Sequence, residues 1–139
     1  DHGIDSLARL YLSGLCGIGY GLRQLLDRFS DRGIAISTLI ASGGAAQSDL
    51  ACQMLADSTG LSVALPAAPE PVLLGAAMLG AVASGVHGDA GSAMAAMSGS
   101  ARLFVPASGD LAALHIRRYA GFTALQQAAR EIRTLIAAP

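Results

Sequence analysis

The sequence predicts an α/β fold in which helices pack on a sheet with parallel strands. Two short β-branched stretches, 34–41 and 61–65, each stand between stretches with helical periodicity. Alternation of this kind favours parallel pairing, because each helix returns the chain to the start of the next strand. Two strands alone make a marginal sheet, and 53% of the 139 residues are apolar. We therefore expect the other strands of the sheet to lie outside this chain.

The composition argues against several classes of protein. The longest apolar stretch, 71–86, contains glycine and serine and is shorter than the roughly 20 residues of a membrane-spanning helix. All nine basic residues are scattered arginines and the net charge is −1, so we expect neither a membrane nor a nucleic acid as partner. Cys16 and Cys52 form no Cys-x-x-Cys motif, which favours reduced core thiols in a cytoplasmic protein.

The first element is a helix predicted over Ser6–Phe29, where apolar residues recur every three or four positions. A second face of this helix carries Gly14, Gly17 and Gly21. Glycine costs about 1 kcal/mol relative to alanine inside a helix. The three glycines therefore predict that this face packs closely against a neighbour.

The later elements alternate between strands and helices. After the first strand and a loop at 42–46, a helix is predicted over Gln47–Ser58, ended by Gly60 and burying Leu50, Met54 and Leu55. The remaining chain predicts the second strand at 61–65, a helix at 72–84, a short helix at 92–97, an extended segment at 102–106 and a long helix at 110–137.

Most motifs for catalysis or metal binding are missing from the sequence. A P-loop needs a lysine, and the chain has none. His2, His87 and His115 lack the spacing of metal ligands, so we expect no metal site in this chain. Asp89 and Asp110 stand where helices begin and are expected to act as caps.

The loop ASGGAAQS is the strongest candidate for a ligand site. It follows a strand and opens a helix, the place where parallel α/β sheets bind ligands. Gly43 and Gly44 would let a nucleotide lie against the main chain, and N–H groups at a helix start favour phosphate. Ser48 offers a hydroxyl to a ligand or to the helix as a cap. A turn without a ligand accounts for the same residues, so both interpretations stay open.

The stretch from Ser42 to Gly85 resembles the C-terminal domain of the FGGY family of carbohydrate kinases. The family pattern Gly-Gly-Gly/Ala-x-x-Ser/Asn is matched by Gly43, Gly44, Ala45 and Ser48. The later family motifs, namely a Gln-Met-x-Ala-Asp run, a Gly-x-Pro-Val-type strand, a Leu-Gly-Ala-Ala helix start and the closing segment, are matched at 53–57, 60–63, 74–77 and 115–126. Within the family, the chain looks most like the ribulokinase or ribitol kinase branch.

The resemblance implies an actin-like ATPase fold of the ribonuclease H type, with two domains around a cleft. Residues 1–139 would be the C-terminal portion of the second, nucleotide-binding domain. The first domain, the start of the second and the catalytic aspartate would lie outside this chain. The implied activity is phosphorylation of a pentulose such as ribulose, or of a sugar alcohol such as ribitol, by ATP with Mg²⁺. The sugar would bind mainly outside this chain, and the kinase could form a homo-oligomer.

The resemblance also assigns roles to the loop residues. The main chain of Gly43, Gly44 and Ala45 would hold the adenosine and α-phosphate side of ATP or ADP, and Ser48 would bind near the adenine or ribose. One position departs from the family: Cys16 stands where its first helix usually carries glutamate. Two alternatives stay open, a non-catalytic actin-like regulator or scaffold that depends on nucleotide, and a small α/β interaction domain that binds none.

Overall fold

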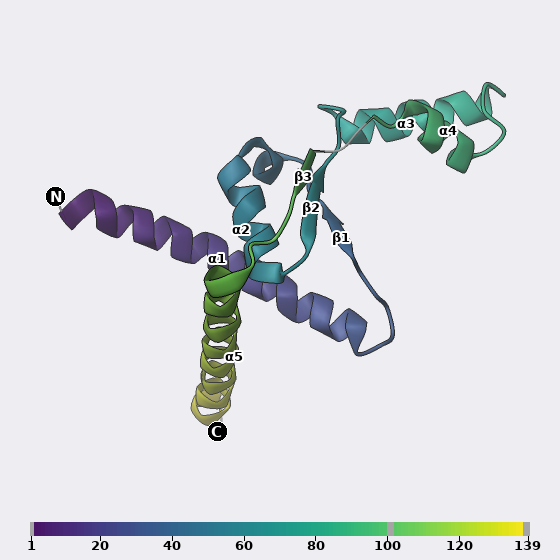
Figure 1. The fold of residues 1–139 in the computed structure, drawn as a ribbon. Coiled ribbons are helices and arrows are strands. Elements are labelled where there is room, and N and C mark those ends of the chain that lie inside the picture. Colours follow the sequence, from purple (N-terminus) through teal and green to yellow (C-terminus); the bar gives the residue numbers. More distant parts are fainter. Residues whose placement is uncertain (1, 100–101, 138–139) are drawn as a thin grey trace.

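The computed structural model describes residues 2–99 and 102–137, and it confirms the predicted α/β class (Figure 1). The elements run in the order α1 (His2–Ser30), β1 (Thr38–Ile40), the 3-10 turn η1 (Gly44–Gln47), α2 (Asp49–Thr59), β2 (Ser62–Leu65), α3 (Pro71–Ala83), α4 (Ala90–Met97), β3 (Arg102–Phe104) and α5 (Gly109–Ala137). The described part has five helices and a small sheet; α2 packs on the sheet, while α3 and α4 extend away from it as a pair (Figure 1).

The sheet has three described strands in the order β1-β2-β3. β1 and β2 pair in parallel, with Leu39 opposite Val63, as the sequence predicts. β3 pairs with the other edge of β2 in the antiparallel direction, with Phe104 opposite Val63. The expectation of only two strands in this chain is therefore corrected. The sequence pattern predicts the extended shape of this segment but not its partner, because the pairing joins residues about 40 positions apart.

A small core lies between α2 and the sheet. Cys52 and Ala56 of α2 pack on Val63 and Leu65 of β2. The predicted burial of Leu50 is wrong, because α2 turns its small side chains inward and leaves this leucine about half exposed. Small residues on that face let the helix axis approach the strands closely. The expectation that Cys16 and Cys52 are core thiols is confirmed by their burial.

The helix α1 packs across α2 through one glycine. A Cβ atom built at Gly19 would lie 1.8 Å from the Ser58 Oγ and 2.8 Å from its Cβ. The predicted glycines Gly14, Gly17 and Gly21 have no described atom within 4 Å of such a Cβ. The prediction that these three pack against a neighbour is therefore not met within the described chain, and the close approach belongs to Gly19.

Polar residues spaced one helical turn apart on α2 hold the segment that leads from β3 to α5. Asp49 pairs with the arginine of β3. Gln53 donates to the Val105 carbonyl at 2.9 Å and to the Asp57 carboxylate at 2.8 Å. Asp57 also accepts from the Ala107 N–H at 2.8 Å. These bonds give the Gln53–Asp57 run a structural role, since they set where α5 begins.

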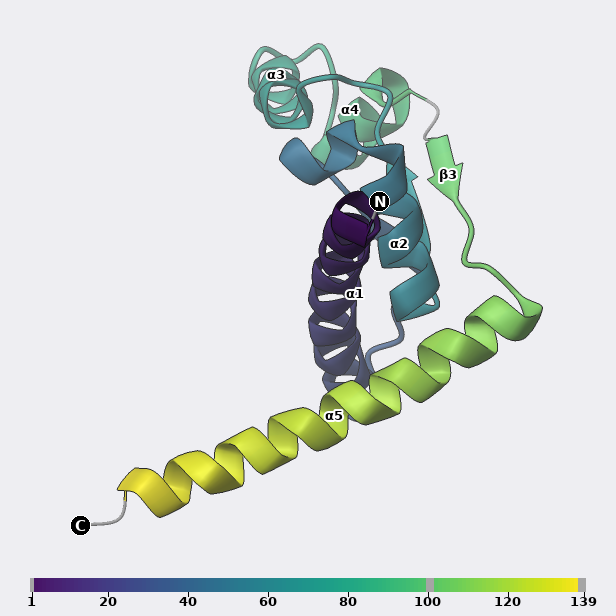
Figure 2. The same ribbon diagram turned by 90° about the vertical axis from the view of Figure 1, so that its left-hand side faces the viewer.

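The helix α5 crosses α1 through an aromatic cluster (Figure 2). The Tyr20 hydroxyl lies 2.9 Å from His115 Nδ1, and both residues are buried. Tyr20 also packs against the rings of Tyr119 and Phe122. Burial lowers the pKa of His115, an effect that the nearby Asp57 carboxylate partly offsets.

The two long helices, α1 and α5, leave much apolar surface exposed. On the predicted apolar face of α1, Leu7 is 67% and Ile18 66% exposed. The far half of α5 exposes Leu125, Ile132 and Leu135 in the same way. Among the described residues, no helix is both long and apolar enough to cross a membrane. Packing of these faces against residues outside the chain stays a prediction.

We predict that Gly19→Ala destabilises the full-length protein by about 1–3 kcal/mol, the usual effect of overpacking. Rotation of Ser58 cannot relieve the contact, because its Cβ is itself too close and its hydroxyl is bonded to the Met54 carbonyl. Gly17→Ala is the matched control, and helix propensity should make it neutral or slightly stabilising. Urea denaturation of both variants tests this, and equal losses would contradict the assignment of the close contact to Gly19.

We also predict a pH dependence of stability that originates at His115. Because its folded pKa lies below the ordinary value of about 6.5, the unfolded chain binds the proton more readily. Stability should therefore fall as the pH drops below about 6.5. His115→Asn should flatten the change in urea midpoint between pH 7.5 and pH 5.5, while His87→Asn should not. The same pH slope in wild type and His115→Asn would contradict this.

Candidate functional site

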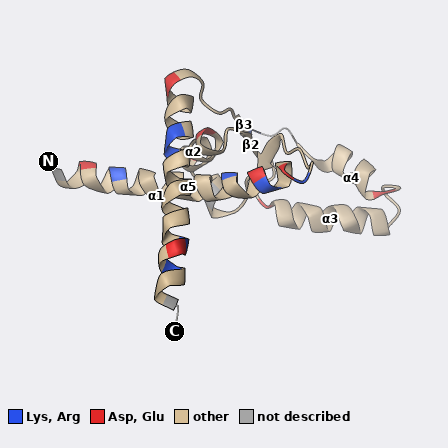
Figure 3. Cartoon of the chain, turned by 90° about the horizontal axis from the view of Figure 1, so that it is seen from below, with Lys and Arg blue, Asp and Glu red and all other residues tan. Residues whose placement is uncertain are grey.

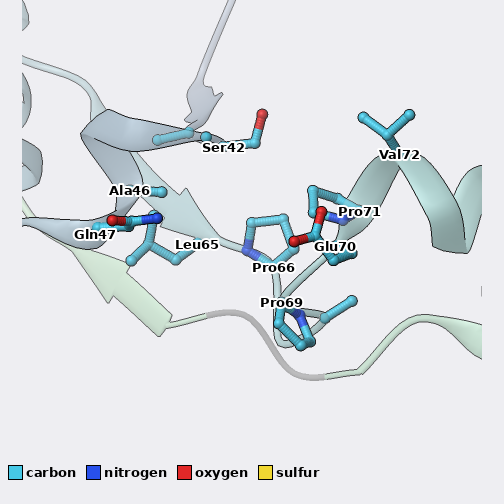
Figure 4. Close-up of a pocket in the computed structure, with 12 residues that line it drawn as sticks. Ser42, Ala46, Gln47, Leu65, Pro66, Pro69, Glu70, Pro71 and Val72 are labelled. Carbon is cyan, nitrogen blue, oxygen red and sulfur yellow. The ribbon is translucent and has the colours of Figure 1, made fainter.

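A cavity of about 520 Å³ lies at the carboxyl edge of the parallel strands (Figure 4). β1 and β2 end at this edge because they run in the same direction. The segments that follow them form the two sides of the cavity. The described lining residues are Ala41, Ser42, Gly43, Ala46 and Gln47 after β1, and Leu65, Pro66, Ala68, Pro69, Glu70, Pro71 and Val72 at and after the end of β2.

The structure gives a reason for glycine at one position of the loop but not at the other. Gly43 has φ +75°, a left-handed conformation that disfavours side chains, and it lines the cavity. Gly44 opens η1 without a positive φ, and a Cβ there would meet no described atom within 4 Å. The turn therefore requires Gly43, whereas neither backbone conformation nor packing within the described chain requires Gly44.

Ser48 is the N-cap of α2. Its Oγ accepts from the Ala51 N–H at 3.3 Å. A hydroxyl that accepts one bond can still donate another, so the cap role leaves a donor for a ligand. Asp49 follows in the first turn, exposed and paired with Arg102. A carboxylate here makes the start of α2 a poor place for phosphate, contrary to what the helix start alone suggests.

The predicted site residues differ in where they lie relative to the cavity. Gly43 lines it, Gly44 and Ser48 flank it along the chain, and Ala45 belongs to η1. Sequence reasoning missed Gln47 and the whole segment after β2 that closes the cavity. The rule that parallel strands end at one edge could have found that segment, because its prolines directly follow the second strand.

The cavity presents polar and apolar surface in similar amounts, and little of the polar surface is charged. Its only described ionisable lining residue is Glu70, and no arginine reaches it; Figure 3 shows the basic residues on other elements. Ser42 and Gln47 add neutral polar groups. Proline, alanine and leucine surfaces suit a flat, uncharged ring. The described wall therefore fits the base and sugar of a nucleotide better than its phosphates.

No cation site is apparent in the described chain. Its His, Cys, Asp and Glu residues form no group of three that could hold a metal ion. Asp89 is confirmed as a cap, since its carboxylate accepts from the Ser92 N–H at 2.7 Å, a bond that lowers its pKa. The expectation that Asp110 caps a helix is wrong, because α5 already begins at Gly109 and Asp110 lies within its first turn. Cys16 is buried beside Tyr20 and does not line the cavity.

Comparison with known proteins identifies the family. The profile of the FGGY family of carbohydrate kinases, C-terminal domain, matches residues 2–84. This chain belongs to the FGGY family. The family domain is the C-terminal part of the actin-like ATPase fold, which agrees with the observed helices on a short sheet. FGGY carbohydrate kinases are phosphotransferases that act on sugars and generally use ATP with Mg²⁺.

Several curated relatives align with most of this chain. An FGGY carbohydrate kinase domain-containing protein of Danio rerio is 38% identical over 133 residues, which cover 96% of this chain and 24% of the relative. The Homo sapiens protein of the same name is 42% identical over 103 residues, covering 74% and 19%. A D-ribulokinase of Saccharomyces cerevisiae is 36% identical over 85 residues, covering 60% and 12%.

A glycerol kinase and a bacterial ribulokinase also match this chain. A glycerol kinase of Shewanella amazonensis is 38% identical over 99 residues, covering 70% of this chain and 20% of the relative. A ribulokinase of Vibrio parahaemolyticus is 32% identical over 114 residues, covering 81% and 20%. This FGGY chain therefore spans at most about a quarter of the length of the curated relatives it matches.

We predict that replacing each loop glycine with alanine has a different effect on stability. Gly43→Ala should destabilise the full-length protein by about 1–2 kcal/mol, because alanine disfavours the left-handed conformation. Gly44→Ala should leave stability unchanged or slightly raise it, since the site is open and the backbone is helical. Melting curves of both variants without nucleotide measure this. A large loss at Gly44→Ala would show that packing outside this chain requires the glycine.

Proposed function

We propose that this chain supplies one wall of the nucleotide site of a kinase that phosphorylates a sugar or sugar alcohol with ATP. Membership of the FGGY family supports the activity class. The cavity at the carboxyl edge of β1 and β2 supports the place of binding, since this edge is where α/β sheets take ligands.

The position of the Gly43–Gly44 loop at the cavity is the observation that carries the assignment. A glycine that neither the turn nor the packing requires has a reason when a ligand lies against its main chain. Gly44 stands between Gly43, which lines the cavity, and Ser48, whose hydroxyl keeps a donor. Together these residues would hold the adenosine end of ATP or ADP, with the main chain of Ala45 continuing the same wall.

The reaction places few chemical demands on this chain. A sugar hydroxyl oxygen would attack the γ-phosphorus of ATP, the bond to the β,γ-bridging oxygen would break, and ADP would leave. The hydroxyl proton would go to a base outside this chain. The described residues that line the cavity include no cation for the phosphates, and the described chain has no ligand set for Mg²⁺. This wall would therefore orient ATP by its adenosine, while groups elsewhere stabilise the charge of the transferring phosphoryl.

The names of the relatives guide the choice of acceptor. They include D-ribulokinase, ribulokinase and glycerol kinase. We propose a pentulose such as ribulose, or a sugar alcohol such as ribitol, bound mainly outside this chain. The alternative is a non-catalytic, actin-like regulator that binds nucleotide without transferring phosphate. Transfer of the γ-phosphate from ATP to D-ribulose, ribitol or glycerol by the full-length protein distinguishes the two.

We predict that Gly44→Val in the full-length kinase raises the KM for ATP with little change in kcat. Valine would stand where the main chain meets adenosine, which takes no part in the bond changes, so ground and transition states should weaken alike. The KM for the sugar should stay nearly constant. Gly88→Val is the matched control, because this exposed glycine also lacks a positive φ and a near neighbour.

A melting curve of each variant separates folding from binding. If Gly44→Val is folded and its KM for ATP equals that of wild type, the loop glycines serve only the turn. The nucleotide assignment of this wall would then be wrong.

A further inference from the structure

One charged side chain that lines the cavity is exposed and has no bonding partner among the described residues. Glu70 occupies the N-cap position of α3, yet its carboxylate makes no capping hydrogen bond, and Pro71 follows at the first helical position. No salt bridge involves it in the described chain. Figure 4 shows its carboxylate on the cavity side of α3, turned toward Pro66. The acceptor oxygens of Glu70 are thus available to a ligand.

The other polar lining groups cannot discriminate between ligands as a carboxylate can. The Ser42 hydroxyl and the Gln47 amide each both donate and accept hydrogen bonds. A carboxylate only accepts, so Glu70 favours a ligand edge with a donor and opposes an edge with an acceptor. Glu70 is exposed and lies among Pro66, Pro69 and Pro71 at the cavity, where a flat ring would lie.

We propose that Glu70 is a specificity-determining residue of the nucleotide site, whose carboxylate accepts a hydrogen bond from the exocyclic amino group of adenine. This inference rests on the proposed function. Guanine carries a carbonyl oxygen at the same ring position, and that oxygen would face the carboxylate without a proton between them. The wall would therefore select ATP over GTP through Glu70.

The ribose is the weaker candidate for this contact. A ribose presents hydroxyls on several sides and would leave the alanine, leucine and proline walls against polar groups. A purine ring would cover those walls and place its amino group beside Glu70. The two sources of donors differ in chemistry, so nucleotide analogues can separate them.

The test is calorimetric titration of the full-length protein with ADP, purine riboside 5′-diphosphate, 2′-deoxy-ADP and GDP. Purine riboside lacks the amino group and retains the ribose. Wild type should bind ADP about tenfold more tightly than the purine riboside compound, the usual value of one hydrogen bond to a charged group near the surface. Glu70→Ala should remove this difference by weakening ADP alone.

Glu70→Gln provides the second variant. Its amide can donate to the guanine carbonyl, so the preference for ADP over GDP should shrink by about tenfold. Glu131→Gln is the matched control, because Glu131 is the other glutamate of the chain and lies on α5, where it accepts from Gln127. That variant should bind all four nucleotides with the same order of affinities as the wild type.

Four results would overturn the inference, and the last would overturn the proposed function as well. Equal loss of ADP and purine riboside diphosphate in Glu70→Ala would exclude the amino group as the partner. Loss of discrimination only against 2′-deoxy-ADP would assign Glu70 to the ribose. If wild type phosphorylates a sugar and binds ADP while no Glu70 variant changes the ranking, only this inference fails. If wild type binds no nucleotide at all, the proposed function fails with it.

Discussion

The parallel pairing of β1 with β2 is the constraint from which the rest of the structure follows. Leu39 opposite Val63 fixes the register, and the buried side of β2 then faces α2. Two parallel neighbours need a crossover, so α2 must cover the sheet on its way between them. Both strands also end at one edge. The Gly43 turn and the proline-rich segment after Leu65 therefore lie opposite each other, and the cavity forms between them.

The helix α2 connects this edge to the far end of the chain. One face carries Cys52 and Ala56 into the core. Another carries the turn-spaced residues Gln53 and Asp57, which bond the main chain between β3 and α5. Ser48 caps the same helix beside the glycine loop. A shift of α2 would therefore move the core, the origin of α5 and the cavity wall together, and a rigid wall is what orientation of a ligand needs.

Local signals explain what the sequence predicts correctly. A helix that ends at Gly60 with φ +75°, a cap at Ser48 and strands bounded by turns depend on neighbouring residues, which the sequence shows directly. The errors concern distant residues. The strand β3 needs β2 as its partner, and the close contact at Gly19 depends on Ser58. The sequence does not indicate a role for Glu70 for the same reason, since this residue lies opposite the glycine loop only because β1 and β2 end at the same edge of the sheet.

The charge distribution of the cavity implies a division of labour in the proposed kinase. Transfer of a phosphoryl group needs positive charge close to the phosphates. The described wall has instead one carboxylate and no arginine, and a carboxylate beside a triphosphate would repel it. Adenosine can lie against Glu70 without this cost, because its base and ribose are neutral. The same residue that would read the base thus directs the phosphates away from this wall, toward the part of the enzyme where the sugar would bind. Orientation of ATP would then follow from the sign of the charge at Glu70 as well as from the shape of the cavity.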